Sequence, residues 1–169
     1  LSFTTDYQQA VTQAEVIMIA VGTPSGADGQ ADLKYVFAAA ESLARYLPQG
    51  AIVVVKSTVP PGTLEKVRQI IRKTASHQNF YLASVPEFLR EGSAVDDTLH
   101  PDRVVIGAET DTVFRKLSEL HQPLKTKIIT MSPESAQMTK YAANAYLATR
   151  ITFINQIADL CEQNGADIN

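Results

Sequence analysis

Residues 15–25 read EVIMIAVGTPS, and residues 51–63 read AIVVVKSTVPPGT. Each stretch is a short apolar run, rich in β-branched residues, that ends in a turn containing Gly and Pro, which is typical of a buried strand entering a loop. A helical pattern follows each run, from about Leu33 to Leu47 with Asp32 as its predicted N-cap, and from Leu64 to about Ala75. This alternation predicts an α/β fold in which right-handed βαβ units form a parallel sheet.

Three further segments complete the predicted sheet, at residues 80–84, 103–107 and 127–130. From Pro133 onward apolar residues recur at helical spacing and no helix breaker precedes Gly165, so we expect one helix from 133 to about 163. At about 1.5 Å per residue this helix spans roughly 45 Å, which is longer than one sheet needs. We therefore divide the chain into a sheet domain, 1–131, and a long connecting helix, 132–169, that leads to another domain or forms an oligomer interface.

The composition limits the classes of function. A chain of 169 residues with 45% hydrophobic and 20% charged residues has the composition of a globular protein. Its formal net charge of -3 provides no general attraction to nucleic acid or anionic membranes, and no apolar run is long enough to span a bilayer. Cys161 is the only cysteine, which excludes an intrachain disulfide and fits a reducing cytoplasm.

Two loops at predicted strand ends carry hydroxyl groups and free backbone donors. The first loop is Val21-Gly22-Thr23-Pro24-Ser25. The second is Lys56-Ser57-Thr58-Val59-Pro60-Pro61-Gly62-Thr63, in which Ser57 and Thr58 are the predicted ligand contacts. Ligands of parallel sheets bind beyond the carboxyl ends of the strands, so a dinucleotide is the expected ligand of these loops. The alternatives are a plain turn for the first loop and, for the second, hydroxyl groups that cap the next helix.

A pair of carboxylates follows the third predicted strand, in the segment PEFLREG at residues 86–92. If this segment is helical, Glu87 and Glu91 lie on one face, four residues apart. One of them then serves as an acid/base group beside a bound substrate. The alternative is a solvated helix start, where acidic residues interact favourably with the helix dipole.

On the long helix, Lys140 and Asn144 also have the spacing of neighbours on one face. A lysine on an Ala-rich face can stabilise a developing oxyanion, with the asparagine as a second donor. The alternative is a surface lysine on a connecting helix.

Cys161 is spaced like a buried helix position and has no basic partner that would activate it as a nucleophile. The three histidines lack the spacing of metal ligands, so no metal site is predicted.

Together these segments resemble the UDP-glucose/GDP-mannose dehydrogenase family. The matching strings are VGTPSGADGQADL, VVVKSTVPPGT, VPEFLREGSAVDD, HPDRVVIG and MTKYAANAYLATRITFINQIADLCEQNGADI. They cover nearly the whole chain in the order and spacing of the family. The glycine that follows Glu91 and the PDRVVIG string look more like the family's UDP-glucose enzymes than its other members.

The resemblance implies that NAD oxidises the C6 alcohol of a nucleotide sugar, expected to be UDP-glucose, to a carboxylate through a thioester on a cysteine. It implies Glu87 as the acid/base residue of thioester hydrolysis and Thr58 as the residue that orients the hydrolytic water. It implies that Lys140 and Asn144 hold the oxyanion at C6. The further substrate contacts that it implies are Phe88, Leu89, Arg90 and Glu91, together with Glu87. The NAD contacts that it implies are Val21, Gly22, Thr23, Pro24, Ser25, Ser57 and Glu91.

By the same resemblance, both ends of the chain look like cuts. A glycine-rich dinucleotide fingerprint is expected before residue 1, and the catalytic cysteine with a further domain is expected after residue 169. We therefore expect a Rossmann-like sheet that lacks its first strands, a fragment inactive alone, and a homodimer formed through the long helix. The alternatives are a dehydrogenase of GDP-mannose or UDP-N-acetylmannosamine, and a non-catalytic assembly module. The PEFLRE and KYAAN strings argue against a 6-phosphogluconate or 3-hydroxyacid dehydrogenase.

Overall fold

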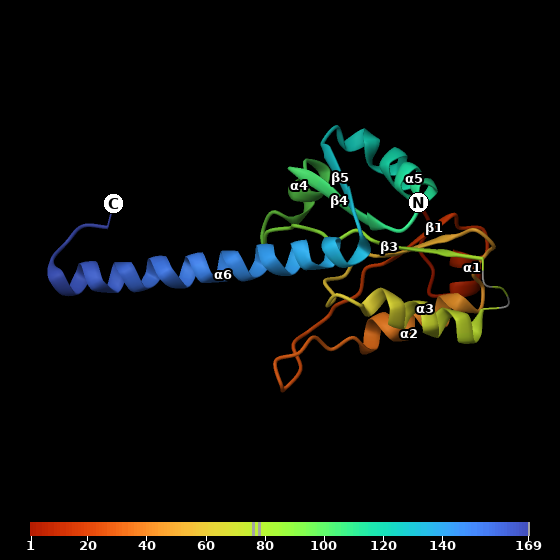
Figure 1. Cartoon of the computed structure of the whole chain (residues 1–169), viewed down its shortest axis with the longest axis horizontal. Coiled ribbons are helices and arrows are strands. Elements are labelled where there is room, and N and C mark those ends of the chain that lie inside the picture. The colour runs from red at the N-terminus through yellow and green to blue at the C-terminus, as the bar shows by residue number, and fades with distance from the viewer. Residues whose placement is uncertain (76, 78, 169) are drawn as a thin grey trace.

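The computed structural model describes residues 1–75, 77 and 79–168, so the last residue of the predicted 132–169 segment lies outside it. A five-stranded sheet in the order β1-β2-β3-β4-β5 forms the centre, and the last helix projects away from it (Figure 1). The strands are β1 (Val16–Ile19), β2 (Ile52–Val55), β3 (Tyr81–Ser84), β4 (Arg103–Ala108) and β5 (Lys127–Met131). The helices are α1 (Tyr7–Val11), α2 (Lys34–Ala44), α3 (Thr63–Thr74), α4 (Ala94–Leu99), α5 (Asp111–His121), a 3₁₀ turn (Gln122–Leu124) and α6 (Pro133–Asn164).

The first three strands are parallel, as predicted, and their carboxyl ends meet at one edge of the sheet. Val16 pairs with Ile52, and Ile52 pairs with Tyr81. All four residues of β2 are buried because helices cover both faces of this strand. Its side chains alternate: Val53 and Val55 enter one core with α2 and α3, and Ile52 and Val54 enter a second core with α5. Figure 1 shows α2 and α3 on one side of the sheet and α5 on the other.

The prediction of a wholly parallel sheet is wrong at β4, which runs antiparallel to β3 with Ser84 beside Gly107. A parallel neighbour requires a crossover connection, usually a helix packed across the sheet. The link of residues 85–102 contains only the short helix α4, so the chain turns back at the carboxyl edge. The start of β4 therefore extends beyond the end of β3. A crossover through α5 then makes β4 and β5 parallel.

Some predicted helix boundaries shift by a few residues. The N-cap of α2 is Leu33, and Asp32, the predicted cap, lies one residue earlier, where its carboxylate accepts the Lys34 N–H at 3.0 Å. The N-cap of α3 is Gly62, whose φ of 85° places it in the left-handed region that glycine adopts readily. The helices α1, α4 and α5 were not predicted from the sequence. Among the described residues, no helix combines the length and apolar character needed to cross a membrane.

The long helix α6 confirms the prediction for this part of the chain. Pro133 occupies its first turn, and the Ser132 hydroxyl accepts the Ser135 N–H at 3.2 Å as an N-cap. The helix ends at Asn164, and Gly165 caps it with a φ of 66° in the left-handed region. Only its first turns pack on the sheet, while the rest projects from it (Figure 1). Cys161 is therefore half-buried near the far end of α6, and its prediction as a core position is wrong.

The first turn of α6 lies directly against β4 at Gly107. A Cβ atom added to Gly107 would come within 2.6 Å of the Ala136 Cβ and 2.8 Å of the Pro133 Cα. Cβ atoms do not approach backbone this closely, so the absence of a side chain at Gly107 permits the contact.

We predict that Gly107→Ala destabilises the intact protein by about 1–3 kcal/mol, because the extra methyl group forces α6 away from β4. The free energy of unfolding from urea denaturation measures the effect. Gly22→Ala is the matched control, since a Cβ there meets nothing within 4 Å. Equal stability of the two variants would show that α6 does not depend on this contact.

Candidate active site

Two hydrogen bonds join the loops that follow β1 and β2. The Thr23 hydroxyl donates to the Thr58 carbonyl at 2.9 Å, and the Ser57 hydroxyl donates to the Val21 carbonyl at 2.6 Å. The alternative in which the second loop's hydroxyls cap the next helix is wrong, because Gly62 is the N-cap of α3 and no side chain caps it. The hydroxyl groups instead hold the two loops beside each other at the carboxyl edge of the sheet.

A hollow of about 720 Å³ lies between these loops and α6. Four of the predicted site residues line it together: Thr23, Ser25, Thr58 and Asn144. Asn144 reaches the hollow from α6, so the helix brings an amide to hydroxyl groups that come from two different strand ends. Val21, Gly22, Pro24 and Ser57 belong to the same loops but do not line this hollow.

Glu87 and Lys140 form an ion pair across the site, with 3.3 Å between Nζ and Oε1. The Lys140 side chain is only 6% exposed and that of Glu87 is 27% exposed. The alternative of a surface lysine on a connecting helix is therefore wrong. A buried ammonium group needs a compensating partner, and the Glu87 carboxylate supplies one. The structure thus brings together two predicted site residues that lie more than fifty positions apart in the sequence.

The segment that carries Glu87 is an irregular loop and not a helix. The Glu87 carboxylate accepts the Leu89 N–H at 2.6 Å, a local bond that competes with helix formation. The expectation that Glu87 and Glu91 share a helix face is therefore wrong. Glu91 is exposed and lines neither the hollow described above nor the cavity beside Glu87.

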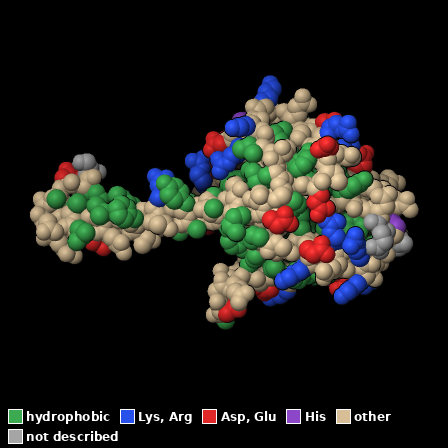
Figure 2. Space-filling view, viewed as in Figure 1, with side chains coloured by type: hydrophobic (Ala, Val, Ile, Leu, Met, Phe, Trp, Pro, Cys, Tyr) green, Lys and Arg blue, Asp and Glu red, His purple; other side chains and the backbone are tan. Residues whose placement is uncertain are grey.

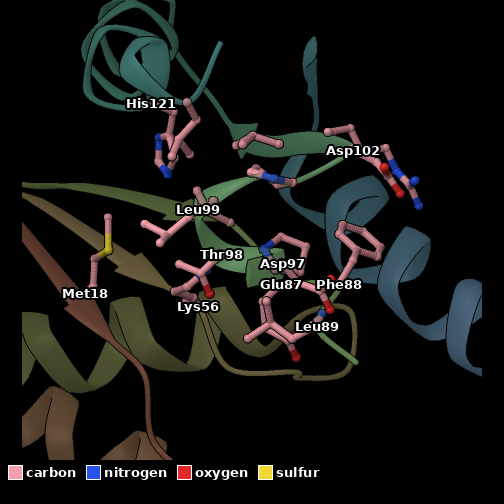
Figure 3. Close-up of a pocket in the computed structure, with 16 residues that line it drawn as sticks. Met18, Lys56, Glu87, Phe88, Leu89, Asp97, Thr98, Leu99, Asp102 and His121 are labelled. Carbon is pink, nitrogen blue, oxygen red and sulfur yellow. Dashed lines mark hydrogen bonds between the residues drawn. The ribbon is translucent and has the colours of Figure 1, made fainter. Parts of the chain in front are cut away.

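Glu87, Phe88 and Leu89 line a cavity of about 310 Å³ together with Lys56, which the sequence analysis did not select (Figure 3). Burial lowers the pKa of Lys56, the nearby Glu87 carboxylate opposes that shift, and the Lys140 ammonium group adds to it. Lys56 therefore lies within electrostatic reach of both members of the Glu87–Lys140 pair. The position of Lys56 at the end of an apolar strand, directly before Ser57, was the available signal in the sequence.

The neighbours of Glu87 in the loop have partners from later parts of the chain. Arg90 binds Asp97 of α4, with 2.6 Å between Nη2 and Oδ1. The Phe88 ring lies 4.5 Å from the Arg103 guanidinium and 5.5 Å from the Lys140 ammonium group. The loop is thus held at several points around Glu87. In the part of the chain that the structure describes, no three His, Cys, Asp or Glu side chains gather as a metal site would require.

Comparison with known proteins gives two family matches. Residues 1–125 match the NAD binding domain of the UDP-glucose/GDP-mannose dehydrogenase family, and residues 134–169 match the central domain of the same family. The chain belongs to this family. The resemblance stated from the sequence motifs is therefore confirmed, as is the α/β fold of an NAD-binding domain.

Individual relatives of this chain support the family assignment. UDP-glucose 6-dehydrogenase TuaD of Bacillus subtilis is 47% identical over 170 residues, an alignment that covers 100% of this chain and 37% of TuaD. The UDP-glucose 6-dehydrogenase of Pseudomonas aeruginosa is 47% identical over 175 residues, covering 99% and 39% of the two chains. The chain thus spans less than two fifths of the length of these relatives.

Solved structures of the family superpose on nearly the whole chain. A UDP-glucose dehydrogenase from Pyrobaculum islandicum has a TM-score of 0.94 and 42% identity, covering 98% of this chain and 39% of that structure. A GDP-mannose dehydrogenase from Pseudomonas aeruginosa has a TM-score of 0.92 and 34% identity, with coverage of 97% and 39%.

We predict that Thr23→Val destabilises the protein by about 1–2 kcal/mol, because the isosteric side chain leaves the Thr58 carbonyl without its donor. Urea denaturation of the intact protein measures the loss. Thr112→Val is the control, since Thr112 is exposed on α5. If both variants lose the same stability, the bond between the two loops contributes nothing.

Proposed function

We propose that the intact protein oxidises the C6 alcohol of UDP-glucose to the carboxylate with NAD. The observation that carries the proposal is the buried Lys140 paired with Glu87 at the carboxyl edge of an NAD-binding domain. The names of the two relatives that are 47% identical support UDP-glucose as the substrate. We also propose that the sheet of the intact protein contains first strands beyond those of this chain.

The hydroxyl-lined hollow fits a dinucleotide at the ends of β1 and β2. When bound, NAD would supply the acceptor for each of the two hydrides that leave the sugar C6 on the way from alcohol to carboxylate, one NAD for each hydride. Thr23 and Ser25 line the hollow and offer hydroxyl oxygens to NAD. Val21, Gly22 and Pro24 lie in the same loop outside the hollow, and they are proposed as further NAD contacts through their backbone groups. The Ser57 hydroxyl donates to the Val21 carbonyl and so holds the loop. Its oxygen is proposed to accept a hydrogen bond from NAD. Glu91 is proposed beside the nicotinamide.

Lys140 and Asn144 are proposed to stabilise the negative charge that develops on the C6 oxygen. An ammonium group has three donors, and one of them is directed at Glu87 in this structure. Two donors therefore remain for a substrate oxygen. Asn144 lies one helical turn further along α6 and adds a neutral donor. The low exposure of Lys140 strengthens its interaction with an oxyanion, because less water screens it.

Glu87 and Thr58 are proposed to act on the water that hydrolyses the thioester. The carboxylate takes a proton from the water as its oxygen attacks the thioester carbonyl. The carbon–sulfur bond then breaks, and the cysteine leaves as a thiolate. That cysteine is proposed to come from outside residues 1–169, since Cys161 is near the far end of α6. The Phe88 and Leu89 backbones, with Arg90, are proposed to contact the nucleotide sugar.

We predict that Glu87→Gln lowers the turnover of the intact protein by roughly 10²–10⁴-fold, because the amide cannot accept the water proton. Thioester should accumulate on the protein, and mass spectrometry of the quenched reaction measures it. Glu41→Gln, a change at an exposed position of α2, is the control and should retain wild-type turnover. Wild-type turnover in Glu87→Gln would remove Glu87 from the mechanism.

We also predict that the intact protein oxidises UDP-glucose faster than GDP-mannose or UDP-N-acetylmannosamine.

We also propose that the 132–169 segment forms a homodimer contact. Hydrophobic side chains are exposed along the projecting part of α6 (Figure 2). They include Leu147, Ile151, Phe153, Ile154 and Leu160. A patch of this kind is rarely left bare on a monomer. A closed dimer places equivalent residues against each other, so two copies of α6 would cover each other's patch.

We predict that Ile151→Glu or Ile154→Glu converts the intact protein from dimer to monomer, because a carboxylate buried at the contact lacks a partner. Size-exclusion chromatography with light scattering measures the mass. Gln9→Glu adds the same charge at an exposed position of α1, outside α6, and should leave the mass unchanged. An unchanged dimer in both Ile variants would place the contact elsewhere.

A further inference from the structure

The loop that carries Glu87 is anchored by two side chains from the segment that follows it, Asp97 and Arg103. Neither residue has a role in the function proposed above. The loop itself has no helix or strand between Val85 and Gly92, so its shape depends on contacts with other parts of the chain. Asp97 contacts Arg90, and Arg103 contacts Phe88, the loop residues that follow and precede Leu89.

Asp97 holds the loop through the backbone of Arg90. Its Oδ2 accepts the Arg90 N–H at 2.7 Å, and its Oδ1 accepts the Arg90 guanidinium at 2.6 Å. The Asp97 side chain is 12% exposed, whereas that of its neighbour Asp96 is 74% exposed and pairs with His100. Of two adjacent aspartates on one short helix, only Asp97 is directed into the structure. The Arg90 hydrogen bonds also lower the pKa of Asp97, so its carboxylate stays charged at neutral pH.

Arg103 holds the loop through the Phe88 ring. It is the first residue of β4, which extends beyond the end of β3 because these strands are antiparallel. This position places its guanidinium 4.5 Å from the centre of the ring, within cation–π distance. The Lys140 ammonium group lies 5.5 Å from the same ring and also contacts Glu87. Phe88 therefore connects the start of β4 to the lysine of the ion pair.

We propose that Asp97 and Arg103 are positioning residues that hold Glu87 against Lys140 and present the Phe88 and Leu89 backbones to the cavity. Their effect on catalysis rests on the function proposed above, whereas their effect on the loop does not. The physical basis is that a catalytic group displaced by about 1 Å can lose on the order of 10²-fold in rate. Two contacts on opposite sides of Leu89 restrict such a displacement.

Amide hydrogen exchange in the intact protein without substrate tests the anchoring directly. Asp97→Ala should make the Arg90 amide exchange roughly tenfold faster, because its acceptor is lost. Asp96→Ala is the matched control, and its Arg90 amide should exchange at the wild-type rate. The amides of β2 should exchange at the wild-type rate in both variants. Arg90→Ala keeps the backbone N–H and should retain slow exchange at residue 90. Equal exchange in the two aspartate variants, or fast exchange in Arg90→Ala, would overturn the role of Asp97.

Arg103 is tested independently, which keeps the proposal falsifiable if Asp97→Ala does not fold. Arg103→Met should speed exchange of the Leu89 amide. The Phe88 ring loses its cation–π contact, and the turn closed by the hydrogen bond from the Leu89 N–H to the Glu87 carboxylate then loses its support. Arg115→Met, a change at an exposed arginine of α5, is the control and should leave Leu89 unchanged. Arg103→Lys retains a cation and should recover part of the protection. Equal Leu89 exchange in Arg103→Met and wild type would exclude the ring contact as an anchor.

Kinetics connect the anchoring to the reaction. Asp97→Ala and Arg103→Met should lower kcat/KM for UDP-glucose roughly tenfold to hundredfold, while Asp96→Ala and Arg115→Met stay within about twofold of wild type. Wild-type kcat/KM in both anchor variants would overturn the positioning role. If the wild-type protein does not oxidise UDP-glucose, the proposed function fails, and the exchange measurements still decide whether these residues anchor the loop.

Discussion

The contact between Gly107 and the first turn of α6 is the constraint on which the rest of the site depends. Because Gly107 has no side chain, the backbone of α6 lies against β4 at Pro133 and Ala136. Lys140 follows Pro133 by about two turns of helix, so the direction of α6 at this contact sets the position of its ammonium group. A helix displaced here would carry Lys140 away from Glu87 and Asn144 away from the hydroxyl-lined hollow.

The ion pair formed in this way is not explained by stability alone. Burying two charges costs desolvation energy that their attraction often fails to recover, and apolar residues of similar volume are often equally stable. Lys56 adds a second cation near Glu87, although burial opposes its charge. An arrangement that concentrates charge beyond the carboxyl ends of the three parallel strands β1, β2 and β3 fits a site that stabilises charge during a reaction, which agrees with the family assignment.

The loop of Glu87 shows how an irregular segment can hold a defined shape. Its local hydrogen bond from Leu89 to Glu87 sets a turn, and contacts from α4, β4 and α6 surround it. The antiparallel direction of β4 matters here, because it sends the start of that strand past the end of β3. The departure from a parallel sheet is therefore part of the site's construction.

The sequence by itself determined the five strands, the helices α2, α3 and α6, and the family. The apolar run at residues 52–55 specifies a strand because its residues are β-branched and turn residues flank it. The strings around Thr58, Glu87 and Lys140 identify relatives because they depend only on local residue order. Only the tertiary structure decided the direction of β4, the irregular loop around Glu87, and the burial of Lys140. It also decided the involvement of Lys56, Asp97 and Arg103. The physical reason is that strand direction depends on the path of a connection, and burial and pairing depend on contacts between residues far apart in the chain. Local periodicity indicates that a segment is buried, but it does not indicate which way a strand runs or which distant residues a side chain contacts.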